Sequence, residues 1–297
     1  MKVLPFRHLL LVLVVMAVWG SNFTVVKLGL RELPPLFLTF LRFFFVFLPA
    51  AFFIRRPAVP WAHLAGYGLM IGAVQFGFLY VALRGHISPG LASLVVQSQV
   101  FMTIGLSIAL AGERVHLFQW GALALAVSGL GIIVAHGGQD ATPLGVMLVL
   151  VAAAGWAGGN HVARLSGRVN MLGYVVWSSL FAAPPLLIMA LIFDGLPAIT
   201  AGLANASWVG WSSVAYQTLA NSMFGYAIWG WLLARYPAAT VAPMSLLVPI
   251  FGFATSALVL DEELQNWKLM AAALVLGGLA LNLLWPRLKI ALAPPAS

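Results

Sequence analysis

The chain has 297 residues, of which 62% are hydrophobic and only 7% are charged, against roughly 25% charged residues in an average soluble domain. This composition is typical of an integral membrane protein and leaves no polar stretch long enough for a separate soluble domain. Cysteine is absent, which excludes disulfides and thiolate chemistry, and the net charge of +8 comes from scattered Lys and Arg rather than from a nucleic-acid-binding face.

Ten apolar runs are long enough to cross a bilayer, since a helix needs about 20 apolar residues to do so. The runs are continuous and much longer than the roughly 10 alternating residues of a membrane barrel strand. We therefore predict an all-α integral membrane protein with short loops, the longest near 194–207. The expected spans lie near 9–27, 35–54, 62–83, 90–111, 117–135, 143–162, 172–193, 208–232, 238–260 and 267–285.

The basic residues separate by side when ten spans are assumed, because both termini then lie on one side. The opposite side holds only Lys27, Arg31, Arg84 and Lys268, together with six of the seven acidic residues. The positive-inside rule therefore predicts cytoplasmic termini. The first run resembles a signal peptide, but no clear cleavage site of small residues follows it, so we expect it to stay in the protein. The terminal side holds ten basic residues: Lys2, Arg7, Arg55, Arg56, Arg114, Arg164, Arg168, Arg235, Arg287 and Lys289.

The two halves of the chain match each other in sequence. At an offset of 148 residues, Phe76-Gly77-Phe78 falls on Phe224-Gly225-Tyr226, and near an offset of 137, Trp19 falls on Trp156. Five spans per half is an odd number, so the second half must enter the membrane from the opposite side. Inverted repeats of this kind are a construction of secondary transporters. We predict a five-helix repeat over residues 1–137 and an inverted five-helix repeat over residues 138–297.

Three stretches also carry a resemblance to a known family: WGSNF in the first span, GLASLVVQSQVFMTIGLSIALAGERV, and PAATVAPMSLLVPIFGFATSALVLDEEL. They look like the drug/metabolite transporter superfamily in its EamA-type branch, and the chain is similar to the YddG-type exporters of amino acids. The resemblance covers nearly the whole chain. It implies ten helices around a central cavity lined by spans one, three, four, six, eight and nine. One departure is that Val96-Gln97-Ser98 stands where the ninth span has LLVP, so the break expected at Pro249 lacks a predicted counterpart.

Polar and aromatic residues inside the spans are the candidates for a binding site, because polar groups in hydrocarbon need a partner or a wet cavity. The alternative for each amide is an interhelical hydrogen bond, and the alternative for each tryptophan is the headgroup belt. We predict a substrate site formed by eleven residues: Trp19, Asn22, Gln75, Phe78, Gln97, Trp156, Asn160, His161, Asn221, Tyr226 and Ser245.

Two ionisable side chains need separate treatment. Arg42 lies inside the second span, where it could attract a substrate carboxylate, but we expect its long side chain to snorkel to the interface. None of the seven carboxylates falls mid-span, so a buried acid that relays protons is missing, and His161 is the group placed to substitute. We therefore expect facilitated movement or unusual coupling.

The predicted function is a secondary transporter that moves small metabolites by alternating access, with no cofactor and no metal. From the resemblance, the substrates would be aromatic or neutral amino acids, exported across a bacterial inner membrane. Alternatives are export of nucleosides or cationic amphiphiles, and a membrane assembly factor, which the short loops disfavour. An enzyme is not expected, because the spans hold no H-E-x-x-H pair and no aspartate pair. The expected partners are a small molecule and the bilayer, with no nucleic acid, and a monomer suffices.

Overall fold

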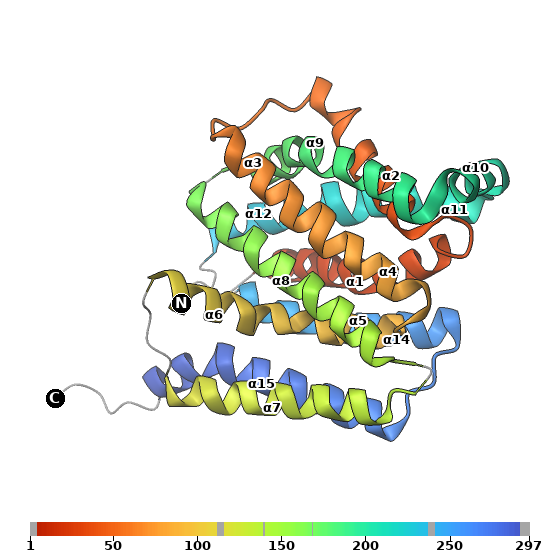
Figure 1. The fold of residues 1–297 in the computed structure, drawn as a ribbon. Coiled ribbons are helices and arrows are strands. Elements are labelled where there is room, and N and C mark those ends of the chain that lie inside the picture. Colours follow the sequence, from red (N-terminus) through yellow and green to blue (C-terminus); the bar gives the residue numbers. More distant parts are fainter. Residues whose placement is uncertain (1–4, 112–115, 139, 168, 237–240, 292–297) are drawn as a thin grey trace.

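The computed structural model describes residues 5–111, 116–138, 140–167, 169–236 and 241–291. Within these residues the regular structure is helical, and the long helices run side by side across the view in Figure 1. Eight helical segments are long and apolar enough to cross a membrane, and Met244–Leu260 is a shorter apolar helix. The prediction of an all-α membrane protein is confirmed. Three of the basic residues used for topology, Lys2, Arg114 and Arg168, lie outside the described residues.

The first half of the chain supplies five helical spans, three of which are divided by short π or 3-10 segments. In chain order they are α1 (Phe6–Gly29); α2 (Pro35–Phe47) with η1 (Ala50–Phe52); α3 (Trp61–Gly68), η2 (Leu69–Phe76) and α4 (Gly77–Gly85); α5 (Pro89–Val95), η3 (Val96–Ser98) and α6 (Gln99–Ala111); and α7 (Leu117–His136).

The second half supplies the other five spans. In chain order they are α8 (Pro143–Leu165); α9 (Met171–Met189), η4 (Ala190–Gly195) and α10 (Leu196–Asn205); α11 (Trp208–Ala215), η5 (Tyr216–Phe224) and α12 (Gly225–Arg235); η6 (Ala242–Leu246) and α14 (Leu247–Leu260); and α15 (Asn266–Ala291). The eighth span is continuous from Trp208 to Arg235, but its polar centre keeps it out of the eight most apolar segments.

Helix starts follow directly from the local sequence. Ser88, Thr142 and Asn170 each accept a hydrogen bond from a backbone N–H in the first turn of α5, α8 and α9, which satisfies donors that have no partner within the helix. At the start of α11, the Ser207 hydroxyl donates to Glu32 over 2.7 Å, and the backbone N–H groups of Ser207 and Gly210 add bonds of 2.8 and 3.0 Å. The Ser207 hydroxyl and these amides hold the pKa of Glu32 below its ordinary value.

The segment near 194–207 is a helix and not the loop that we expected. Gly195 takes a left-handed backbone with φ of 81° and turns the chain, and Pro197 lies in the first turn of α10. Proline is favoured at that position because its missing N–H has no acceptor there. The run of helix from Met171 to Asn205 therefore bends instead of ending after the seventh span.

Departures from α-helical geometry recur at matching positions of the two halves. The π segment Leu69–Phe76 in the third span corresponds, at the offset of 148 residues, to Tyr216–Phe224 in the eighth. The 3-10 segment Val96–Ser98 in the fourth span corresponds to Ala242–Leu246 in the ninth. The prediction of an unmatched break at Pro249 is therefore wrong. That proline lies in the first turn of α14, and the break precedes it.

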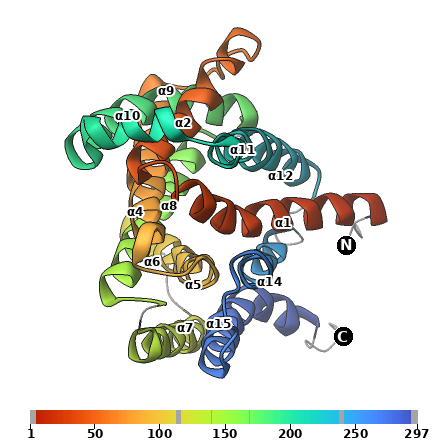
Figure 2. The ribbon, with the colours of Figure 1, turned by 90° about the vertical axis from the view of Figure 1, so that its right-hand side faces the viewer.

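Close packing of α1 against α14 holds the two halves together. Figure 2 shows α1 crossing the middle of the bundle, between α11 and α12 above and α14 below, and α1 contacts all three. The approach depends on Gly20, where an added Cβ would lie 2.5 Å from Cβ of Phe251 and 2.6 Å from the carbonyl oxygen of Val248. A pair formed by α7 and α15 lies at the lower edge of both views.

Gly20→Ala is expected to lower the free energy of unfolding by about 1–3 kcal/mol, because the new methyl group overpacks the contact between α1 and α14. Thermal unfolding of the detergent-purified protein measures this effect. The matched control is Gly131→Ala, since an added Cβ at Gly131 meets nothing within 4 Å. Equal unfolding temperatures for the two variants would show that α1 does not depend on a close approach at Gly20.

Candidate functional site

A central cavity of about 360 Å³ lies between the two halves, a size within the range of small-molecule sites. Its lining residues come from spans one, three, four, six, eight and nine, with one residue each from α9 and α15. The lining residues are Trp19, Asn22, Phe23, Tyr67, Phe76, Leu79, Val96, Gln97, Gln99, Val100, Trp156, Asn160, Ala163, Met171, Asn221, Tyr226, Trp229, Ser245, Val248 and Leu283. None of these side chains carries a full charge.

The structure brings most of the predicted site residues together at this cavity. Gln75 is buried with no hydrogen-bond partner for its Oε1 among the described residues, Phe78 packs against the core, and His161 is partly exposed on α8. These three do not line the cavity. The eight that do are Trp19, Asn22, Gln97, Trp156, Asn160, Asn221, Tyr226 and Ser245.

Aromatic rings form one wall of the cavity. The Trp19 ring lies 5.6 Å from the Tyr226 ring and 5.4 Å from the Trp229 ring, and its Nε1 donates to the carbonyl oxygen of Asn221 over 3.2 Å. Gly225 makes room for this indole, because an added Cβ would lie 2.4 Å from Nε1. Trp229, Tyr67 and Phe76 also line the cavity but were not among the predicted site residues. The helical spacing of three between Tyr226 and Trp229 was a signal for Trp229.

Gln97 and Ser245 join the two halves across the cavity. The Gln97 Nε2 donates to the backbone carbonyl of Ser245 over 3.2 Å. The two residues are separated by the repeat offset of 148, so they occupy equivalent positions in the 3-10 segments of the fourth and ninth spans. A 3-10 turn leaves carbonyl groups without their usual α-helical partner, and here one of them is satisfied by the other half.

The cavity reaches toward the end of the bundle where α1 begins. Ala163, Met171 and Leu283 lie near the ends of α8, α9 and α15 that share this side. Toward the opposite end, α1, α5 and α14 close together. The hydroxyls of Thr24 and Thr255 lie 3.1 Å apart, and a Cβ at Gly252 would lie 2.3 Å from the Ser93 hydroxyl.

An ion-pair cluster completes the closure at this opposite end. We call it the Glu262 clamp. The Glu262 carboxylate accepts hydrogen bonds from the Ser88 hydroxyl at 2.5 Å, from the Gly90 N–H at 3.2 Å, and from the Ser256 hydroxyl. The Nζ of Lys268, a fully buried side chain, lies 3.2 Å from Glu262 and 2.8 Å from Asp140. The clamp thus ties α5, α14, α15 and the loop before α8 together.

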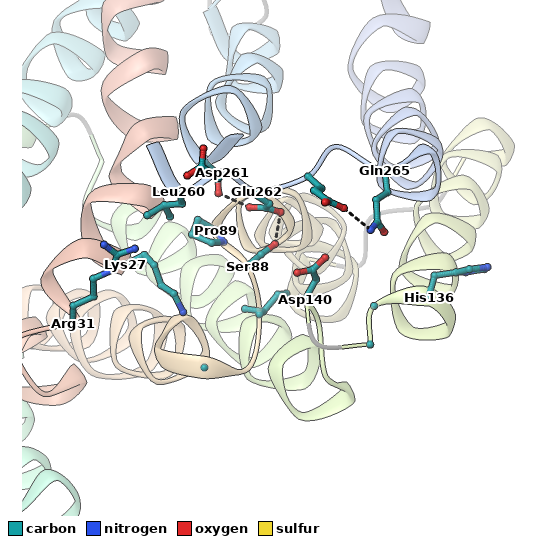
Figure 3. A pocket seen from close by; sticks show the side chains of 16 residues that line it. Lys27, Arg31, Ser88, Pro89, His136, Asp140, Leu260, Asp261, Glu262 and Gln265 are labelled. Atoms are coloured by element: carbon teal, nitrogen blue, oxygen red, sulfur yellow. Dashed lines mark hydrogen bonds between the residues drawn. The ribbon is translucent and has the colours of Figure 1, made fainter. Parts of the chain in front are cut away.

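Beside the clamp is a wide polar pocket of about 650 Å³. Figure 3 shows Lys27 from α1 and Arg31 from the turn after α1 facing Asp140, Asp261 and Glu262 across it. The Lys27 Nζ donates to the carbonyl of Leu83 over 2.7 Å, so α1 is also tied to α4 at this end. The pocket is open and hydrophilic, which is typical of an aqueous vestibule.

Arg42 does not snorkel, and that prediction is wrong. The side chain is 1% exposed, and its guanidinium donates to the hydroxyls of Tyr80 and Ser222, each over 3.0 Å, and to Asn221 Oδ1 over 2.7 Å. It also stacks on the Phe76 ring, 3.8 Å from the centroid. Two helical turns separate Arg42 from the start of α2, roughly 10 Å, and that depth was the signal against snorkelling.

A helical membrane bundle with two matching halves around a cavity lined by apolar and aromatic side chains and a few amides defines a multi-pass transporter. The model of the EamA-like transporter family matches residues 7–135 and 143–284. The chain belongs to this family.

Two bacterial relatives are similar over almost their whole length. Both are named "Probable amino-acid metabolite efflux pump". The Escherichia coli (strain K12) protein is 42% identical over 92% of this chain and 93% of its own, and the Salmonella typhimurium protein is 40% identical over 94% and 95%. A crystal structure with 18% identity superposes with a TM-score of 0.62 over 93% of this chain and 97% of its own, and so shares the fold.

The absence of cysteine makes the cavity directly testable by labelling. Ala163→Cys places a thiol on the lining of the cavity. Two controls lie on the same helix: Met147→Cys places the thiol on its exposed apolar face, and Ala153→Cys places it on its buried face. In proteoliposomes, a charged methanethiosulfonate reagent given to both faces is expected to modify Ala163→Cys about tenfold faster than either control, because only thiols in water ionise and react. Equal rates would contradict an aqueous cavity.

Proposed function

We propose that this protein exports small amino-acid-like metabolites from the cytoplasm by alternating access. The observation that carries the proposal is a cavity built from both halves, which reaches toward one end of the bundle and is closed at the other by the Glu262 clamp. A carrier that alternates needs a site between two similar halves and a gate on each side. In this proposal the clamp is the gate that must open to release the substrate.

The proposed orientation places the termini, and the end toward which the cavity reaches, in the cytoplasm. Ten of the basic residues belong to that side by the assumed topology, and the opposite side holds only four. One of those four, Lys268, is paired with two carboxylates. Its charge is therefore compensated, and it reduces the difference in basic charge between the two sides only slightly. The protein would then stand in an inward-facing state in a bacterial inner membrane, with a substrate able to enter from the cytoplasm.

The substrate class in this proposal rests on the relatives and on the cavity. Two relatives at 40–42% identity are named as amino-acid metabolite pumps. A cavity of about 360 Å³ with aromatic rings and amides suits a small, partly polar metabolite. The site would include the eight predicted residues that line the cavity. Gln75, Phe78 and His161 would act only through the helices that carry them.

The proposal includes a non-enzymatic monomer with repeats over residues 1–137 and 138–297. The matched family segments, 7–135 and 143–284, support this division. Because the two halves of one chain enclose the cavity, a second copy is not needed to complete the site.

Counterflow in proteoliposomes tests the transport activity. Vesicles loaded with unlabelled amino acids are expected to accumulate a labelled amino acid, and Trp156→Ala should lower the initial rate by about tenfold, because the indole supplies part of the cavity wall. Trp120→Ala is the matched control, since this indole is 58% exposed on α7, away from the cavity. Absence of flux with all twenty amino acids, in protein that unfolds normally, would overturn the proposed substrate class.

Glu262→Gln tests the clamp as the outer gate. The change removes the charge that holds Lys268, Ser88 and Gly90, and hydrogen bonds to a charged group each contribute about 1.5–3 kcal/mol. We expect the outward-open state to gain population by about tenfold or more, since each 1.4 kcal/mol is tenfold. A thiol at Thr24→Cys, buried between α1 and α14 in the closed end, should then react correspondingly faster with an impermeant reagent from outside.

Glu263→Gln is the matched control for the clamp. It removes a neighbouring carboxylate that is bonded to Gln265 and lies outside the clamp. If both variants left the labelling rate of Thr24→Cys unchanged, the clamp would not be a gate, even if transport itself persisted.

A further inference from the structure

Arg42 is a buried cation whose contacts are all neutral. Its guanidinium is bonded to Tyr80 from the third span and to Asn221 and Ser222 from the eighth. In the part of the chain that the structure describes, no carboxylate lies within ion-pair distance of it. A charge buried in a membrane bundle without a counterion is costly, so such residues mark functional sites by default.

A small chamber of about 10 Å³ adjoins Arg42, which is room for one water-sized group. Ser178 from α9 and Ser222 also line it. The Ser178 hydroxyl is 2% exposed and has no hydrogen-bond partner among the described residues. A buried hydroxyl of this kind is expected to have a partner, so the chamber offers an unused donor beside a guanidinium.

The chamber and the central cavity share one wall. The rings of Tyr67, Phe76 and Tyr226 line both spaces. Asn221 provides a second link, because its side chain lines the central cavity and its Oδ1 accepts from Arg42 Nη2. With its oxygen held by the guanidinium, Asn221 offers its amide nitrogen, a hydrogen-bond donor, to a ligand.

We propose that Arg42 and Asn221 form the seat for a carboxylate group of the transported molecule. This inference rests on the proposed function and specifies the chemistry of its substrate. The described lining of the cavity holds no charged side chain, so the field at the Asn221 wall comes from Arg42. Within a membrane bundle this charge is screened less than in bulk water, so it attracts an anionic group. It equally repels a cationic amphiphile that has no carboxylate, which was one of the alternative substrates.

Asn22 provides the complementary contact for an amino group. It lies one helical turn after Trp19, whose indole is bonded to the backbone of Asn221. The Asn22 Oδ1 is buried, has no hydrogen-bond partner among the described residues, and belongs to a side chain that lines the cavity. An ammonium group donates and does not accept, so a zwitterion would satisfy both ends of the site.

The experiment measures binding by tryptophan fluorescence, because Trp19, Trp156 and Trp229 line the cavity. The twenty standard amino acids, acetate and propionate are titrated into the purified protein. The best amino acid is then compared with its carboxamide and with the amine left by decarboxylation. The wild-type protein is expected to bind the free acid about tenfold or more tighter than either analogue, as charge-assisted hydrogen bonds are the strong ones.

Arg42→Gln should abolish this preference, and Arg42→Lys should retain part of it. We expect the Kd of the acid to rise about tenfold in Arg42→Gln while the Kd of the carboxamide changes less than about twofold. Arg56→Gln is the matched control, because Arg56 lies over the Trp61 ring outside the cavity. Thermal unfolding checks the fold, and glutamine can still bond to Tyr80 and Ser222.

The outcomes separate this inference from the proposed function. The carboxylate seat is overturned if the acid and the carboxamide bind to the wild type with equal Kd, or if Arg42→Gln raises both Kd values equally. Arg42 would then be only structural, while amino-acid transport would stand. If acetate or propionate binds through Arg42 but no amino acid does, the seat stands and the amino-acid function fails. If no compound binds, both proposals fail.

Discussion

A polar group inside hydrocarbon must find a partner within the protein, and this constraint organises the whole bundle. The backbone meets it by forming helices, and the side chains meet it by gathering on the inner faces of spans one, four, six, eight and nine. At the closed end, one carboxylate satisfies a serine, a backbone amide and a buried lysine at once. At the centre, Arg42 draws on three neutral groups and still lacks a counterion among the described residues.

The breaks in the helices follow from the same constraint. A π or 3-10 segment frees carbonyl groups that would be intolerable against lipid but are acceptable where they line a cavity or meet another helix. Four of these segments, in spans three and eight and in spans four and nine, are equivalent members of the two repeats. The halves therefore share the places where they depart from regular geometry, in addition to their order of helices.

Much of the fold could be predicted from the sequence, because hydrophobic length decides a membrane span almost alone. The cavity could be predicted in part. Eight of the eleven candidates line it, since a polar group deep in a span needs either a partner or a wet cavity. The errors arose where residues distant in the sequence determine the position of a side chain or helix. Arg42 was misplaced because its partners Tyr80 and Asn221 lie 38 and 179 residues away. The helix α10 was missed because residues near 194–207 were assigned to a loop.

The contact between Gln97 and Ser245 has a geometric consequence. When two equivalent residues of an inverted pair touch each other, they must lie near the axis that relates the halves. Points near a rotation axis are displaced least when the halves exchange conformations. Under the alternating access proposed above, a solute held beside this contact would stay almost stationary while the helix ends around it move. The opening and closing of the barriers, rather than movement of the solute, would then change the side to which it is exposed.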